Sequence, residues 1–345
     1  VTKSNGGIMP VAAARTQTVT TLLSGPASGV IGPAYVAGEA GLRHVITLDV
    51  GGTSADMAVV EGGRPRWSTT EHVGGVPVMM PVVGVTAIGA GGGSIAWVDE
   101  VGIPKVGPQS TGAQPGPACY GRGGKDATLT DAFLVCGFLD PERFLGGRMP
   151  LRRELADEAV ARFAGPLGAT SDEAAESIVR VAVSNMYAEF TKILSRAAVD
   201  ARDFALVAFG GAGPVVGALV AREVGISTVF VPRSPGTLCA LSALSADVVS
   251  DAVRTVHAKA EAASPATLRE VYAALCAELG DWLARHGADA ASSGFGLAAD
   301  MRYIGQSYEI AVPLEPAWLA SDGLPRILAA FHPAHEPAFG HAHPE

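Results

Sequence analysis

The sequence predicts an α/β fold in which helices and strands alternate around a buried sheet. One observation is the apolar segment 204–209, followed by a glycine turn at 210–214, a helical stretch to about residue 224 and an apolar segment at 228–231. This order of strand, glycine turn, helix and strand is typical of α/β proteins. A second observation is the apolar, β-branched run 45–50, which ends in a short polar turn. A third is the composition, since 48% hydrophobic and 17% charged residues exclude a disordered chain.

The first elements follow from local composition. Residues 17–23 are rich in threonine and valine and predict a short β segment. Gly25-Pro26 opens a helix of small residues that extends to about Gly41, with a break or bend near Gly32-Pro33, because proline removes a helical hydrogen bond. Strands are predicted at about 44–50, 55–61 and 64–70, and the last two form a hairpin around Gly62-Gly63.

The remaining elements alternate less regularly. Residues 74–147 are dense in glycine and proline and predict a long loop-rich insert. Periodic apolar residues then predict helices at 152–163 and 171–198, the second beginning at Ser171-Asp172-Glu173. A helix at about 265–286, strands near 296–303 and 307–313, and a final helix near 323–335 complete the chain.

Charge and cysteine content exclude several classes of function. The formal net charge of the 345 residues is -9, with 25 basic and 34 acidic side chains, so we expect no nucleic-acid partner. The four cysteines lack the CxxC spacing of zinc sites, and their small number fits a reducing cytoplasm better than a disulfide framework. No apolar run reaches the roughly 18 residues of a membrane span, and no signal peptide is evident, so no membrane partner is expected.

The segment around Asp49 predicts half of a nucleotide site. A carboxylate at the end of a buried strand is costly unless it holds a cation, directly or through water, so Asp49 is the candidate catalytic and metal-binding acid. The turn that follows lets the backbone approach a ligand and adds hydroxyl and amide donors. Its residues Gly51, Gly52, Thr53 and Ser54 are candidate phosphate ligands.

A second glycine turn supplies the other candidate surface. Gly210, Gly211 and Gly213 lie between a strand and a helix whose first turn contains Pro214, and such a helix N-terminus can seat a ribose, base or phosphate. Alone, this turn is better explained by packing. Paired with the Asp49 turn, it favours nucleotide binding.

Two further segments are ambiguous. Asp56 follows the turn on the next strand and is a second candidate catalytic acid, as a general base or as support for Asp49, with a purely structural role equally open. Gly91, Gly92 and Gly93 could form a nest of amide groups for a phosphate or oxyanion, against the alternative of a hinge.

Other polar residues favour structural roles. Asp131 follows Thr128 at the start of an apolar helix, so helix capping is expected. Cys119 is expected to be a buried, inert thiol rather than a nucleophile. The terminal histidines are expected to lie in a solvated tail rather than a metal site; they are His332, His335, His341 and His343.

Together the motifs resemble a known family. The Asp49 and Gly210 turns resemble the second phosphate motif and the adenosine motif of the actin, sugar kinase and Hsp70 ATPase superfamily. Further segments resemble the hydantoinase A/oxoprolinase family, in order along residues 1 to 340. They are Ser24-Gly25-Pro26-Ala27, Gly89 to Ala96, Pro115 to Gly121, Thr130-Asp131-Ala132 and Met301 to Ser307.

The resemblance implies a ribonuclease H-like ATPase lobe. It would comprise an inter-lobe segment at 1–43, the lobe itself at 44–255 with the glycine-rich insert, and a truncated C-terminal α+β segment at 256–345. It also implies ATP and Mg²⁺ as cofactors, with Asp49 holding Mg²⁺ through water. The implied reaction is the phosphorylation of a ring amide, such as a hydantoin or 5-oxoproline, followed by hydrolytic opening.

The resemblance also implies a partner and a missing piece. The partner would be a hydantoinase B-type subunit or fused domain, and a homo-oligomer is left open. No first phosphate hairpin is found in the chain, so we expect a fragment that lacks the opposite lobe and does not turn over ATP alone. Relatives usually carry aspartate where Gly84 stands and histidine, arginine or asparagine where Thr86 stands, which implies a change in activity or substrate class. A ketone carboxylase subunit and a non-catalytic nucleotide-binding protein are the alternatives.

Overall fold

The computed structural model describes most of the chain in two compact units. The described residues are 1–68, 71–73, 75–78, 80–286, 293–307, 309–320 and 323–343. The first unit spans residues 1–247 and the second 248–345. The boundary therefore falls earlier than residue 255, and the predicted inter-lobe segment 1–43 lies within the first unit.

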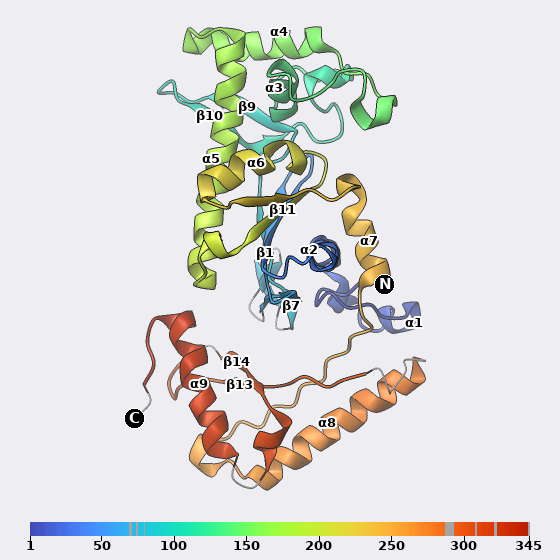
Figure 1. Cartoon of the computed structure of the whole chain (residues 1–345), viewed down its shortest axis with the longest axis vertical. Helices are drawn as coiled ribbons and strands as arrows, with labels where there is room; N and C mark the ends of the chain where they lie inside the picture. Colours follow the sequence, from blue (N-terminus) through green and yellow to red (C-terminus); the bar gives the residue numbers. More distant parts are fainter. Residues whose placement is uncertain are drawn as a thin grey trace. The chain divides into compact units, whose positions relative to one another are not determined.

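A mixed sheet forms the centre of the first unit (Figure 1). Its strand order is β12-β11-β1-β2-β3, and β8 also pairs with β2. The bounds are β1 Val45–Val50, β2 Ala55–Glu61, β3 Arg64–Pro65, β8 Thr86–Ile88, β11 Ala205–Phe209 and β12 Thr228–Phe230. An antiparallel meander β1-β2-β3 beside the parallel strands β11 and β12 is the ribonuclease H-like arrangement, so the predicted fold class is confirmed.

Alternation along the strands gives the sheet two buried faces. Ile46, Leu48 and Val50 of β1 pack into the larger hydrophobic core with helices α5 Ser171–Ala197 and α6 Gly213–Val224. Val45 points to the opposite face, which packs against α2 Ser24–Glu39 and α7 Leu238–Ser245. Figure 1 shows α5 and α6 on one side of the sheet and α2 and α7 on the other. Asp49, one residue before Val50, is therefore carried on the face of α2 and α7.

The glycine-rich insert is more ordered than predicted. It contains the antiparallel hairpin of β9 Ser94–Val98 and β10 Pro104–Ser110, and the buried helix α3 Leu129–Val135. Short strands in or beside the insert are β4 Trp67–Ser68, β5 Glu71–Val73, β6 Val76–Val78 and β7 Val82–Val83. The region is loop-rich as predicted, but the prediction missed these short elements, which the glycines connect by tight turns.

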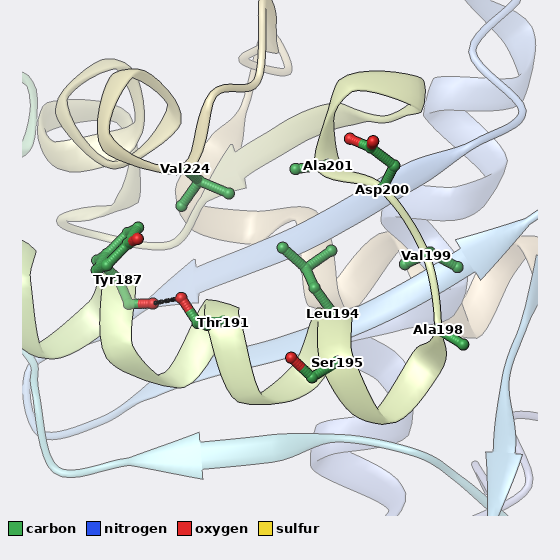
Figure 2. A pocket seen from close by; sticks show the side chains of 9 residues that line it. All are labelled: Tyr187, Thr191, Leu194, Ser195, Ala198, Val199, Asp200, Ala201 and Val224. Carbon is green, nitrogen blue, oxygen red and sulfur yellow. Dashed lines mark hydrogen bonds between the residues drawn. The ribbon is translucent and has the colours of Figure 1, made fainter. Parts of the chain in front are cut away.

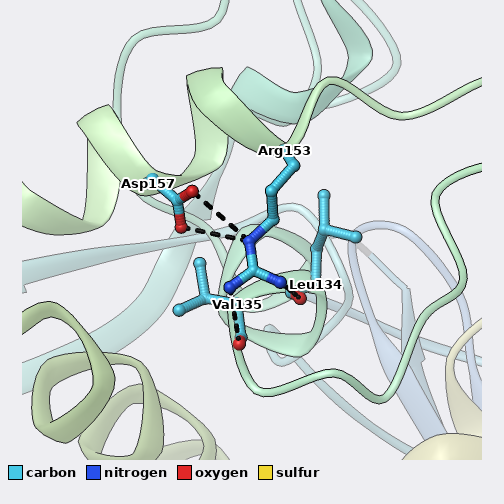
Figure 3. A network of polar contacts seen from close by, with 4 residues as sticks. All are labelled: Leu134, Val135, Arg153 and Asp157. Carbon is cyan, nitrogen blue, oxygen red and sulfur yellow. Dashed lines mark hydrogen bonds and ion pairs between the residues drawn. The ribbon is translucent and has the colours of Figure 1, made fainter.

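Helix α3 is fixed at both ends by side chains. Thr128 and Asp131 form a capping box at its N-terminus, as expected. At its C-terminus the guanidinium of Arg153, from α4 Arg153–Ala164, donates to the carbonyls of Leu134 and Val135 at 3.1 and 3.2 Å (Figure 3). Arg153 also pairs with Asp157 at 3.2 Å. A cation at a helix C-terminus satisfies free carbonyls and the helix dipole together.

One local prediction was wrong, and of a second the structure excludes one of the two alternatives. Residues 18–21 form a 3₁₀ turn instead of a strand, and the hydroxyls of Thr20 and Thr21 donate to carbonyls three residues back. Such local bonds compete with a strand ladder. Helix α2 is not broken at Gly32-Pro33, since it is helical from residue 24 to 39.

The second unit is a small α+β assembly. Helices α8 Pro265–Arg285 and α9 Leu324–Phe339 flank the antiparallel pair β13 Leu297–Met301 and β14 Ile310–Leu314. Phe331 and Val312 lie in its core. The remaining helices are α1 Val11–Ala14 in the first unit and short 3₁₀ turns in both. Among the described residues, no helix has the length and apolarity that a membrane span requires.

Candidate nucleotide site

The predicted phosphate turn connects β1 and β2 at one end of the sheet. Val50 and Ala55 are paired, and the Gly51 amide donates to the Ser54 carbonyl at 3.0 Å, which closes the turn. Gly52 and Thr53 are exposed, and a Cβ added at Gly52 would meet no described atom within 4 Å. One side of the turn is therefore open to a ligand.

The turn also presents unused donors. Within the part of the chain that the structure describes, the backbone amides of Gly52, Thr53 and Ser54 donate no hydrogen bond. Consecutive free amide groups on an exposed turn are a favourable seat for an anion such as a phosphate.

Two acids stand beside this turn. Asp49 and Asp56 are register partners across the antiparallel pair of β1 and β2, and both are half-buried. Burial raises the pKa of Asp49, although a hydrogen bond from Cys239 opposes the shift. Burial also raises the pKa of Asp56, with a further contribution from the negative charge of Asp49. No ion pair of the described residues includes either carboxylate, so no basic side chain in that part of the chain offsets their negative charge.

The residues present fit a divalent cation that is coordinated mainly by the phosphates of a bound substrate and by water. Among the described residues there is no group of three or more histidine, cysteine or acidic side chains arranged to hold a metal. Mg²⁺ commonly binds through one or two carboxylates together with substrate phosphates and water. Two carboxylates beside a turn of free amides match that donor set.

The second glycine turn packs directly onto Asp49. Gly210 has φ +83°, and a Cβ added there would collide with Asp49 Oδ1 and lie 2.6 Å from the Val50 carbonyl oxygen. The Ala212 amide donates to that same carbonyl at 2.8 Å. Gly213 is buried, and its added Cβ would lie 3.2 Å from the Leu48 carbonyl oxygen. Two of the three glycines therefore allow close packing, whereas Gly211 is exposed and open.

The third glycine segment, residues 91–93, supports the phosphate turn by hydrogen bonds to its backbone. Gly91, Gly92 and Gly93 are buried, and the amides of the last two donate to the Gly51 and Gly52 carbonyls at 2.9 and 2.6 Å. The Gly91 amide donates to Ser94 Oγ at 2.9 Å. All three expected donors are thus engaged inside the protein, which favours a supporting role over a phosphate nest.

A cavity of about 460 Å³ elsewhere in the unit contains none of the predicted site residues. It lies beside the C-terminal part of α5, and Figure 2 shows Leu194, Val199 and Val224 around it. Its acid, Asp200, is engaged by Arg202, whose hydrogen bonds lower the pKa of Asp200 to about 2. This cavity offers no unengaged charged group for catalysis.

A cavity of about 370 Å³ opens at the acid pair itself. Its walls come from four elements: Thr47 and Asp49 of β1, Asp56 of β2, residues of α2, and Cys239 of α7, with Val85 before β8. Sequence reasoning missed the contributions of α2 and α7. Cys239 Sγ lies 3.2 Å from Asp49 Oδ2, and this contact joins residues 190 positions apart, for which no local sequence pattern gives a signal.

The other polar candidates have structural roles. Asp131 is fully buried and accepts hydrogen bonds from Thr128 and from the amides of Ala118 and Cys119. Burial strongly raises the pKa of Cys119, with the Asp131 charge as a second cause, so this thiol is inert as expected.

The expected solvated histidine tail was wrong for His335, whereas His341 and His343 are exposed as expected. His335 is fully buried on α9, 2.8 Å from the His341 carbonyl oxygen and 3.1 Å from Gln306. His332 contacts the Tyr303 hydroxyl at 2.8 Å. His332 thus packs against an aromatic residue, and His335 against an amide, in the second unit.

Comparisons with known proteins show which proteins this chain resembles. Residues 1–252 match the family described as Hydantoinase/oxoprolinase. The chain is 34% identical to caprolactamase subunit alpha of Pseudomonas jessenii over 99% of the chain and 50% of that protein. It is 38% identical to the acetophenone carboxylase gamma subunit of Aromatoleum aromaticum over 66% of the chain and 31% of that subunit.

A solved structure extends the likeness to the fold. The ATP-dependent caprolactamase from Pseudomonas jessenii superposes with a TM-score of 0.86 at 33% identity, covering 99% of this chain and 50% of that one. The chain therefore spans about half the length, or less, of the relatives it matches.

Proposed function

The chain belongs to the hydantoinase/oxoprolinase family, and from this premise we propose that it supplies one lobe of the nucleotide site in an ATP-dependent enzyme that hydrolyses a cyclic amide. The observation that carries the proposal is the run of free amides at 52–54 beside the Asp49–Asp56 pair. Donors for phosphate and carboxylates for a cation occur there together, at the end of a rigid sheet.

Each residue has a separate task in this proposal. Asp49 would hold Mg²⁺ through water, and the amides of Gly52, Thr53 and Ser54 would bind phosphate oxygens. The exposed Gly211 would line the adenosine, while Gly210 and Gly213 hold that turn against β1. ATP with Mg²⁺, when bound, supplies the phosphoryl group that converts an amide oxygen into a leaving group.

Asp56 is proposed either to place a second carboxylate beside Asp49, so that a cation binds more favourably between them, or to accept a proton. Its placement directly across from Asp49 supports the first role, since each carboxylate raises the energy of its neighbour until a cation arrives. A general-base role needs the substrate within hydrogen-bond reach of Asp56, and the cavity at the acid pair would allow this.

The substrate is proposed to be a small ring amide, and the partner a hydantoinase B-type subunit or domain. The name of the caprolactamase relative supports a lactam-like ring and a second subunit. Val85, between the unusual Gly84 and Thr86, lines the cavity beside the acids, so the departures from the family at those two positions are proposed to affect the ring substrate rather than the nucleotide. All four cysteines are free thiols, which supports a cytoplasmic location.

The test is ATP consumption coupled to ring opening. The protein in its full encoded length, with its co-encoded partner, is assayed with hydantoin, 5-oxoproline and caprolactam, and ADP and the ring-opened acid are measured in parallel. The proposal expects one ring to give both products in equal amounts and the Asp49→Asn variant to give neither.

A ketone carboxylase is the second candidate, favoured by the likeness to the acetophenone carboxylase subunit. Bicarbonate-dependent ATP turnover with acetone or acetophenone, and none with any ring amide, would replace the first proposal with this one.

A further inference from the structure

The Asp49 carboxylate is held by a side chain that the nucleotide motifs do not include. Among the described residues, the hydrogen bond that the Asp49 side chain accepts comes from Cys239 Sγ, at 3.2 Å from Oδ2. The other oxygen, Oδ1, faces Gly210. A neutral thiol is a weak donor, but here its acceptor is a carboxylate, which strengthens the bond.

Cys239 is itself fixed by contacts further along α7. Ser242, one helical turn later, is fully buried; its hydroxyl accepts from the Gly32 amide of α2 at 2.8 Å and donates to the Ser28 carbonyl. A Cβ added at Gly32 would collide with the Ser242 hydroxyl and lie 2.9 Å from the Leu238 carbonyl oxygen. The two helices can therefore shift little against each other without breaking these bonds.

Helix α2 also closes the space around the thiol and the carboxylate. A Cβ added at Gly29 would lie 3.7 Å from Asp49 Oδ2 and 3.9 Å from Cys239 Sγ, which is ordinary packing distance. Gly29 and Cys239 both line the cavity at the acid pair. The thiol thus lies inside the site, on a helix whose position is set by a buried hydroxyl.

We propose that Cys239 is a positioning residue, which holds Asp49 Oδ2 so that the carboxylate keeps one orientation toward the cation despite repulsion from Asp56. The inference rests on the proposed function, because that function gives Asp49 its role. The thiol is proposed to act through Asp49 and not on the reacting atoms.

The test measures the Mg²⁺ concentration that gives half-maximal ADP binding, by calorimetry on the full-length protein. Cys239→Val keeps roughly the side-chain volume but removes the donor, and should raise that concentration about 3–10-fold. Cys239→Ser keeps a donor and should stay within about 3-fold of wild type. ADP affinity at saturating Mg²⁺ and the melting temperature should change little in both variants.

Cys276→Ser, on α8 in the second unit, is the matched control and should bind like wild type. Equal Mg²⁺ dependence for wild type and Cys239→Val would overturn the inference, as would an equal loss in Cys239→Ser and Cys239→Val, which would indicate packing alone. If Cys239→Val does not fold, Cys239→Ala serves as the donor-free variant. Wild-type protein without Mg²⁺-dependent ADP binding would instead refute the proposed function.

Discussion

Replacing Gly210 by alanine should damage the site and the fold together. Gly210 adopts φ +83°, a region that an L side chain enters at a cost of about 1–2 kcal/mol. The new Cβ would also collide with Asp49 Oδ1 and come within 2.6 Å of the Val50 carbonyl oxygen. The Val50 carbonyl belongs to the backbone of β1 and Asp49 Oδ1 to a short side chain beside it, so the turn or the strand must move.

The size of the effect follows from these two contributions. Forced contacts in a packed region cost about 1–3 kcal/mol, which with the backbone strain gives a total of about 2–5 kcal/mol. For a unit the size of residues 1–247, each kcal/mol lowers the melting temperature by about 2–4 °C. Gly210→Ala should therefore melt about 4–20 °C below wild type.

The matched control is the neighbouring glycine. Gly211 is exposed, and an added Cβ would meet no described atom within 4 Å, so Gly211→Ala should change the free energy of unfolding by no more than about 0.5 kcal/mol. Both variants are compared with wild type by thermal and urea unfolding followed by circular dichroism. Equal stability of Gly210→Ala and wild type, or equal loss in the two variants, would refute the packing argument.

Three further predictions concern other charged groups. Asp131→Ala leaves buried donors unsatisfied and should lower the free energy of unfolding in urea by about 3–4 kcal/mol. The control Asp126→Ala, at an exposed position, should leave it nearly unchanged. An unchanged stability of Asp131→Ala would contradict this prediction. Arg153→Ala removes the C-terminal cap of α3 and should lower the free energy of unfolding by about 1 kcal/mol in the same assay. This loss is larger than the loss of an exposed ion pair alone would cause. The pKa of Asp56 is raised on folding, so its contribution to stability is present below the unfolded pKa and is lost as pH rises through the folded pKa. Without nucleotide, Asp56→Asn should therefore be more stable than wild type near neutral pH, and this gain should disappear in acid; a gain independent of pH would refute it.

Local signals predicted the two turns of the site well. The β-branched run before Asp49 and the glycines after it determine a hairpin with little help from the rest of the chain. The apolar strand before Gly210 and the helix after it are likewise encoded within about twenty residues. The carboxyl ends of adjacent parallel strands then bring Asp49 and Gly210 together.

Contacts between distant segments were not predictable in this way. The sequence around Cys239 is rich in small residues and gives no helical periodicity, and its contact with Asp49 depends on the whole sheet being formed. His335 was expected in solvent because its partner Gln306 lies on another element. The glycine-rich run at 91–93 was a candidate for ligand binding, but the amides of Gly92 and Gly93 donate hydrogen bonds to the carbonyls of Gly51 and Gly52.

The most direct measurement of the central claim is a crystal structure of the full-length protein with ADP and Mn²⁺, in which anomalous scattering locates the metal. The account predicts a manganese peak within about 5 Å of the Asp49 carboxylate, bridged by water, with phosphate oxygens on the amides of Gly52, Thr53 and Ser54. Bound nucleotide whose phosphates and metal lie away from this turn would contradict it.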